Sequence, residues 1–125
     1  MNTMNRMALL GAAIVAVSAW GTALAQAPAK TADGVLTNGA GMTLYTFDND
    51  SGGKSMCNGP CAGNWPPLLA AADAKASGDW SVVTRDDGGK QWAYKGKPLY
   101  TWSKDAKPGD KTGDGFKNVW HVAKP

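Results

Sequence analysis

The sequence predicts an all-β fold, a small antiparallel β domain built from two tandem hairpin-plus-loop repeats with approximate internal two-fold symmetry. The first indication is self-similarity: residues 41–50 read GMTLYTFDND, residues 96–105 read GKPLYTWSKD, and Trp65 and Trp120 keep the same offset of 55 residues. A repeat at a fixed period indicates duplicated supersecondary units. The second indication is composition, because 16 Gly, 7 Pro and the absence of Glu favour turns and strands over helices.

The N-terminal 25 residues have the pattern of a cleaved signal peptide. Arg6 supplies a positive charge, residues 8–19 form an apolar run, and Ala23-Leu24-Ala25 provides small residues at a cleavage site. We therefore expect cleavage after Ala25 and a periplasmic or secreted protein. The apolar run is shorter than the about 20 residues that a membrane-spanning helix needs, so no transmembrane segment is expected after cleavage.

The rest of the chain is expected to form a flexible tail over residues 26–32 and a single β-rich domain over residues 33–125. The two repeats would occupy about residues 33–77 and 88–125. The net charge of the whole chain is only +3, which does not favour nucleic acid as a partner.

Individual elements follow from local patterns. Turn residues lie at 38–39, 86–89 and 95–96. Two prolines at 66–67 exclude a central strand there and fix an extended segment. Residues 70–76 are compatible with a short helix. Apolar periodicity predicts strands over residues 35–37, 42–47, 80–84, 91–94, 98–102 and 119–122.

The motif Tyr-x-aromatic-x-x-Asp occurs at residues 45–50 and 100–105. Together with Cys57–Ala62, Trp65-Pro66-Pro67 and the closing segment 113–122, it makes the chain resemble the bacterial "secreted repeat of unknown function" family, described as predicted lipoproteins with a conserved Yx(FWY)xxD motif. The resemblance implies export and a repeat fold, but no activity. This chain lacks the lipobox cysteine. The repeat residues expected to form the scaffold are Tyr45, Phe47, Asp50, Trp65, Tyr100, Trp102, Asp105 and Trp120.

The only two cysteines, Cys57 and Cys61, are expected to form a disulfide in an oxidising compartment. Thr112 and Phe116 take their places in the second repeat, so the second loop does without a bridge. Closing a loop of about five residues contributes only about 2 kcal/mol. We therefore interpret the disulfide as a local clip.

An alternative use of the same pair is a copper or thiol-redox site. Thiolates with imidazole or thioether ligands favour copper, and Met56 and His121 would complete the set with Cys57 and Cys61. Zinc is not expected, because the chain has a single histidine.

We expect functional residues mainly at positions where the two copies differ, because the residues that both copies share are expected to form the common scaffold. Besides the cysteine pair, Pro66 is matched by His121, and Asp48 is matched by Ser103. Asp-rich segments at residues 48–53 and 110–115 resemble calcium loops in part, but they lack the final Glu and are better explained as Asx turns.

The chain contains no P-loop, nucleophile elbow or dinucleotide fingerprint. We therefore expect an exported, non-enzymatic binding or envelope-interaction module without a cofactor, whose partner is a small ligand or an envelope protein. The alternative is a periplasmic copper-binding or thiol-redox protein that uses the C-x-x-x-C pair.

Overall fold

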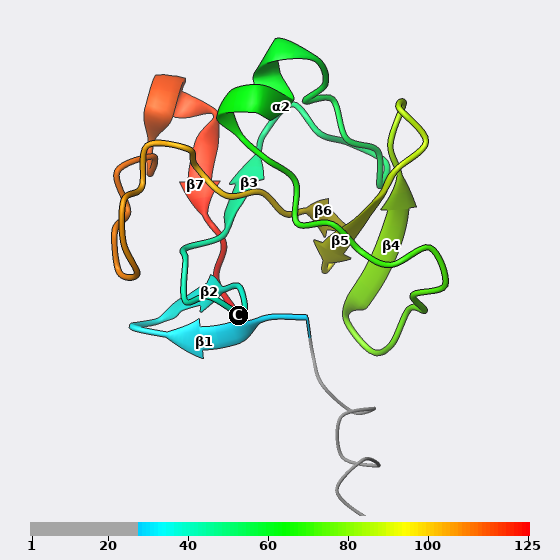
Figure 1. Cartoon of the computed structure of the whole chain (residues 1–125), viewed down its shortest axis with the longest axis horizontal. Coiled ribbons are helices and arrows are strands. Elements are labelled where there is room, and N and C mark those ends of the chain that lie inside the picture. Colours follow the sequence, from blue (N-terminus) through cyan, green and yellow to red (C-terminus); the bar gives the residue numbers. More distant parts are fainter. Residues whose placement is uncertain (1–27) are drawn as a thin grey trace, which may run out of the picture.

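The computed structural model describes residues 28–125 and shows an all-β fold with little helix (Figure 1). The predicted signal peptide and its cleavage site lie outside the described residues. The strands form three small antiparallel sheets in the described part of the chain. They are β1 (Lys30–Ala32) with β2 (Val35–Thr37), β3 (Tyr45–Phe47) with β7 (Trp120–Val122), and β4 (Trp80–Thr84) with β5 (Lys90–Tyr94) and β6 (Lys97–Pro98).

The hairpins follow the predicted turn chemistry. Thr84 faces Lys90 across the predicted 86–89 turn, and Lys95 and Gly96 adopt positive φ values of 50° and 83° between β5 and β6, as tight hairpins require. Asp33-Gly34 forms a further turn of this kind. It pairs β1 with β2, so a strand begins inside the segment predicted as a tail.

The short helix does not form at residues 70–76, where the sequence is compatible with one. Residues 70–76 contain a turn and no helix, and most of them are exposed. A helix there would have no apolar face to bury, and isolated short helices are unstable. Instead, the loop after Gly59 contains α2 (Pro60–Asn64), which begins with proline at a position where its missing N–H is harmless. The 3₁₀ turn η3 (Phe116–Asn118) stands at the repeat-related position.

The two-fold relation passes through the two motif tyrosines. The backbone N–H of Tyr45 donates to the carbonyl of Tyr100 at 2.7 Å, and the N–H of Tyr100 donates to the carbonyl of Tyr45 at 3.0 Å. An antiparallel pair between equivalent residues places the symmetry axis between them. The predicted internal symmetry is therefore present at the centre of the molecule.

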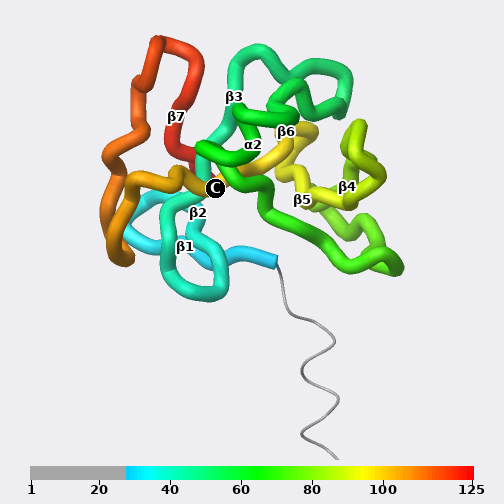
Figure 2. Tube along the Cα trace, turned by 45° about the horizontal axis from the view of Figure 1, so that its top comes forward, coloured from blue at the N-terminus to red at the C-terminus, as the bar shows by residue number. Residues whose placement is uncertain are grey.

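Each repeat pairs its motif strand with the closing segment of the other repeat. Strand β3 pairs with β7, and both views place them side by side (Figures 1 and 2). The Asp48 N–H donates to the Val119 carbonyl at 2.8 Å, and the equivalent Ser103 N–H donates to Asn64 at 2.9 Å. Pro66 lacks an N–H and only accepts, from Thr101 at 2.8 Å, so this second pairing is not a full ladder.

Two apolar clusters pack around this interlocked centre. One consists of Leu36, Leu44, Leu99 and Ala123. The other contains the motif aromatics with Cys57. No helix in the described residues has the length and apolarity needed to cross a bilayer.

Candidate functional site

The motif aromatics form a continuous stack of four rings across the two-fold axis. Trp65 and Trp120, which are repeat equivalents, lie at its centre with ring centroids 3.8 Å apart and planes within 2°. Phe47 stacks on Trp120 at 4.2 Å, and the equivalent Trp102 stacks on Trp65 at 3.9 Å. Contacts between large stacked rings stabilise this arrangement beyond burial alone. The repeat aromatics therefore form one rigid element.

The motif tyrosine of each repeat donates a hydrogen bond to the motif aspartate of the other repeat. The Tyr45 hydroxyl donates to Asp105 Oδ2 at 2.7 Å, and the Tyr100 hydroxyl donates to Asp50 Oδ2 at 2.7 Å. The other carboxylate oxygen holds its own loop: Asp50 Oδ1 accepts from the Met56 N–H at 2.6 Å. Each aspartate thus ties its loop to the tyrosine of the opposite copy.

Burial governs the protonation of these groups. It raises the pKa of Tyr45 well above its ordinary value, assisted by the hydrogen bond to Asp105. Burial also raises the pKa of Tyr100, although the hydrogen bond with Ser55 lowers it in part. The pKa of Asp50 is raised because desolvation outweighs the bonds from Tyr100 and Met56 that lower it. Both hydroxyls therefore remain donors at neutral pH.

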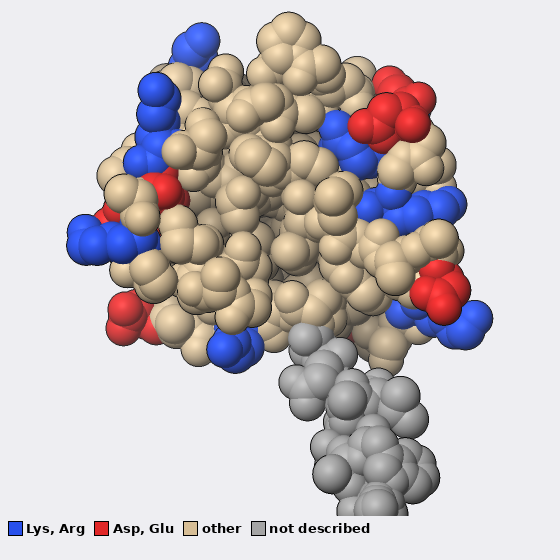
Figure 3. Space-filling model, in the orientation of Figure 1, with Lys and Arg blue, Asp and Glu red and all other residues tan. Residues whose placement is uncertain are grey.

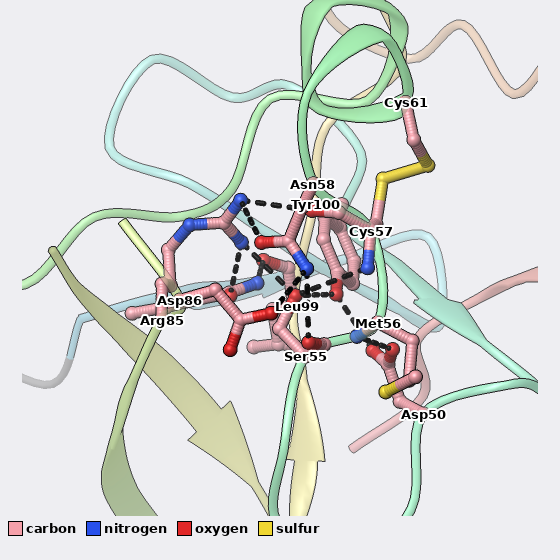
Figure 4. Close-up of a disulfide and its surroundings, with 11 residues drawn as sticks. Asp50, Ser55, Met56, Cys57, Asn58, Cys61, Arg85, Asp86, Leu99 and Tyr100 are labelled. Carbon is pink, nitrogen blue, oxygen red and sulfur yellow. Dashed lines mark hydrogen bonds between the residues drawn. A yellow bond between two sulfur atoms is a disulfide. The ribbon is translucent and has the colours of Figure 1, made fainter. Parts of the chain in front are cut away.

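Arg85 is a buried residue at the same centre that sequence reasoning missed. Its side chain is only 2% exposed. Nη1 donates to Ser55 Oγ at 3.0 Å and to Gln91 Oε1 at 2.8 Å, and Nη2 donates to the Cys57 carbonyl at 2.8 Å (Figure 4). Ser55 Oγ lies 2.6 Å from the Tyr100 hydroxyl. A planar guanidinium suits such a fork. In the sequence, Arg85 only precedes a polar turn, and nothing marks it as buried.

The predicted disulfide is confirmed. Cys57 and Cys61 are bonded with an S–S distance of 2.05 Å. The four candidate copper ligands are not brought together, because both sulfurs are bonded to each other and His121 Nε2 lies 2.8 Å from Asp48 Oδ2 instead. Met56 is 52% exposed. Among residues 28–125, no cluster of three or more His, Cys or Asp side chains could hold a metal ion. Beyond the disulfide itself, this geometry gives the copper or thiol-redox alternative no support.

A groove of about 370 Å³ opens beside the aromatic stack. Its aromatic wall comprises Phe47, Trp65, Trp102, Phe116 and Trp120, and its polar edge includes Asn49, Asn64 and Lys117. Three of the rings are nearly buried, while Phe116 is 36% exposed. The groove therefore has a rigid apolar wall next to amide and ammonium donors.

A family model described as "Secreted repeat of unknown function" matches residues 27–69 and 81–124. The chain belongs to this family. The two matches start earlier than the expected repeats at 33–77 and 88–125. Comparison with curated proteins and with solved structures gives no match. The description of the secreted-repeat family assigns no activity.

The positions at which the two copies of this secreted repeat differ fall in separate places. His121 and Asp48 come together across the β3–β7 pair. The cysteine pair lies in the segment that follows β3, where the Cys57 carbonyl accepts a hydrogen bond from Arg85 (Figure 4). Comparison of the two repeats in the sequence identified these positions and grouped the cysteines with His121. In the structure, the cysteines and His121 lie in separate places.

Proposed function

We propose that the protein is an exported, non-enzymatic binding module that holds a small neutral ligand bearing hydroxyl groups, such as a sugar unit, in the aromatic groove. The observation that carries this proposal is the combination of a rigid aromatic wall with amide donors at one edge. A volume of about 370 Å³ is at the lower end of the range of small-molecule pockets.

The chemistry of the wall and edge supports a neutral ligand. Aromatic rings that are already packed supply apolar contact area without losing side-chain freedom on binding. The amides of Asn49 and Asn64 both donate and accept hydrogen bonds, as hydroxyl groups require. Among the described residues, 28–125, Lys117 is the only charged one that lines the groove. On the face of the molecule shown in Figure 3, the charged side chains stand mainly at the margins and the centre is uncharged.

Backbone strain at the groove edge supports the same proposal. Lys117 and Asn118 both adopt left-handed conformations, with φ values of 51° and 60°. Such conformations are uncommon for residues other than glycine, and they cost on the order of 1 kcal/mol each. They hold Phe116 and Lys117 at the groove, where the Lys117 ammonium lies 5.6 Å from the Phe116 ring centre.

Titration of the tag-free, oxidised protein with N-acetylglucosamine, glucose and maltose tests this function. We expect a saturable change in tryptophan fluorescence with at least one sugar, because three tryptophans line the groove. Phe116→Ala should weaken binding about tenfold, in line with the loss of about half of a buried phenylalanine contact. Leu69→Ala is the matched control, since Leu69 is 66% exposed and lies outside the groove.

The proposal fails if none of the three sugars gives a saturable signal, or if the two variants bind alike. Chemical conversion of the bound sugar would contradict the non-enzymatic part.

We also propose cleavage after Ala25 and delivery to the periplasm or beyond. Its support is the signal-peptide pattern together with the description of the family as secreted. The intact mass of the exported protein should correspond to a chain that starts at Gln26; a mass that retains residues 1–25 would refute cleavage.

A further inference from the structure

A second pocket, of about 320 Å³, lies on the opposite face of the β3–β7 pair from the aromatic groove. Side chains alternate between the two faces of a strand, and here Thr46 and Asp48 line this pocket while Phe47 and Asn49 line the groove. The two cavities share no lining residue. They are therefore independent sites.

The pocket combines an apolar floor with charged edges. Its floor includes Leu99, which is fully buried, and Ala123, which is 4% exposed. The ionisable residues that line it are Asp48, Tyr94, Lys95, Lys97, His121 and Lys124. They come from the residue after β3, the end of β5, the β5–β6 turn, β6, β7 and the residues after β7.

The positive charge of this pocket is not neutralised within the described part of the chain. Among residues 28–125, Lys95, Lys97 and Lys124 take part in no ion pair, whereas Asp48 is paired with His121 at 2.8 Å. Three ammonium groups around one cavity with low-dielectric walls concentrate a positive potential inside it.

Comparison of the two repeats shows that the frame does not need these charges. In the first repeat, Ala40, Met42 and Leu69 stand in the places of Lys95, Lys97 and Lys124. The backbone hydrogen bonds of this region are nevertheless matched in the two halves: the Ala123 N–H donates to Leu44 at 2.8 Å, and Leu68 donates to Leu99 at 2.9 Å.

His121 and Asp48 follow the same pattern. Pro66 and Ser103 occupy their places in the other half. Every charged position of the pocket is thus uncharged in its repeat counterpart, so these charges belong to this cavity and not to the common scaffold.

We propose that this pocket binds a small organic carboxylate with an apolar body. The ammonium groups supply the charge that attracts the carboxylate. The floor of Leu99, Val122 and Ala123 takes the apolar body. Asp48 is the single carboxylate among residues 28–125 that lines the pocket, and it would repel the carboxylate of the ligand. Its hydrogen bond with the imidazole of His121 reduces this repulsion.

The test uses three probes on the tag-free full-length mature protein: 1-naphthoate, the neutral 1-naphthalenemethanol and inorganic phosphate. His121 is the only histidine, so its imidazole proton signals in one-dimensional NMR report this pocket without isotopic labelling. We expect saturable shifts with 1-naphthoate and at least about tenfold weaker binding of the other two probes. Binding should weaken as salt is added, because exposed charges are screened.

Substitution of single lysines tests whether their ammonium groups attract the carboxylate of the ligand. Lys97→Gln and Lys124→Gln should each weaken 1-naphthoate binding about two- to fivefold, the range for one exposed ion pair. Lys104→Gln, at an exposed position outside the pocket, should leave it unchanged. Equal binding of the neutral probe, equal binding of phosphate, or the same affinity in all three variants would each overturn the proposal. Sugar binding in the aromatic groove is read separately by tryptophan fluorescence, so the two sites can fail independently.

Discussion

Removing one hydroxyl at the centre of the molecule tests whether the repeats hold each other together. In Tyr100→Phe the ring and its packing remain, but two hydrogen bonds are lost: the one donated to Asp50 at 2.7 Å and the one shared with Ser55 at 2.6 Å. Tyr45→Phe loses the equivalent bond to Asp105 at 2.7 Å and leaves the Gly113 N–H without its acceptor.

The expected cost follows from the kinds of bond lost. A hydrogen bond to a charged group contributes about 1.5–3 kcal/mol, and a buried donor left without a partner adds to that cost. Because the phenylalanine ring leaves no cavity, we expect each variant to lose about 2–3 kcal/mol of unfolding free energy. This is a large part of the stability of a domain of this size.

Urea unfolding of the oxidised protein, followed by tryptophan fluorescence, measures the loss. Tyr94→Phe is the matched control, because Tyr94 is half-buried and lies outside this network; it should change stability by less than about 0.5 kcal/mol. A double-mutant cycle of Tyr100→Phe with Asp50→Ala should give a coupling energy of about 1–2 kcal/mol.

The pH dependence provides a second check. Burial raises the pKa of Asp50 in the folded protein from its ordinary 3.8, so its contribution to stability is fully present below pH 3.8 and is lost as the pH rises through the folded value. The bond from Tyr100 serves the ionised carboxylate, and the deficit of Tyr100→Phe should therefore be larger at pH 7 than at pH 3. A variant as stable as Tyr94→Phe, a coupling energy near zero, or a deficit independent of pH would refute the reasoning.

Three further outcomes are expected. Reducing the Cys57–Cys61 bridge should lower the unfolding free energy by about 2 kcal/mol; complete unfolding would show that the bridge is more than a local clip. Gly113→Ala should lower the unfolding free energy measured in urea by about 1–3 kcal/mol, because the new Cβ would lie 2.6 Å from a stacked tryptophan ring. Gly63→Ala in α2 has open space for its Cβ and should be neutral or stabilising. Equal effects of the two variants would contradict the close packing at Gly113. The raised pKa values of the two motif tyrosines imply that stability is maintained up to about pH 10 and then falls by about 1.4 kcal/mol per pH unit for each tyrosine; a stability that is flat between pH 10 and 11 would refute this.

Local turn chemistry and the repeat period were sufficient to predict the fold class and most strands. The Lys95-Gly96 turn and the extended Pro66-Pro67 segment depend on neighbouring residues alone, and a sequence reading captures such features. The short helix could not be placed, because its position depends on which segments find a packing partner. Residues 70–76 have helix-forming alanines but remain mostly exposed.

Long-range partners were beyond the sequence. Tyr45 and Asp50 stand in one motif, yet each bonds to the other copy, and the sequence holds no signal of that exchange. The same limit hid Arg85, which donates to Ser55 and Cys57 in a loop about 30 residues earlier in the chain as well as to the nearby Gln91. For the site, comparing the copies identified His121 and the cysteines as special but could not separate them, because that requires knowing where the segment with the cysteines lies relative to β7.

The interlocked pairing explains why the differences between copies collect where they do. A change in the shared tyrosine, aspartate or tryptophan of one repeat is felt by the other repeat, because each of these side chains contacts its opposite copy. Positions such as Lys97 and His121 line a cavity instead, so they can differ between the halves without disturbing the frame. Since Phe47 of β3 lines one cavity and Asp48, which follows β3 directly, lines the other, a constrained and a free position stand next to each other in the chain. A duplicated scaffold of this kind can hold two unlike binding sites on the two faces of one strand pair.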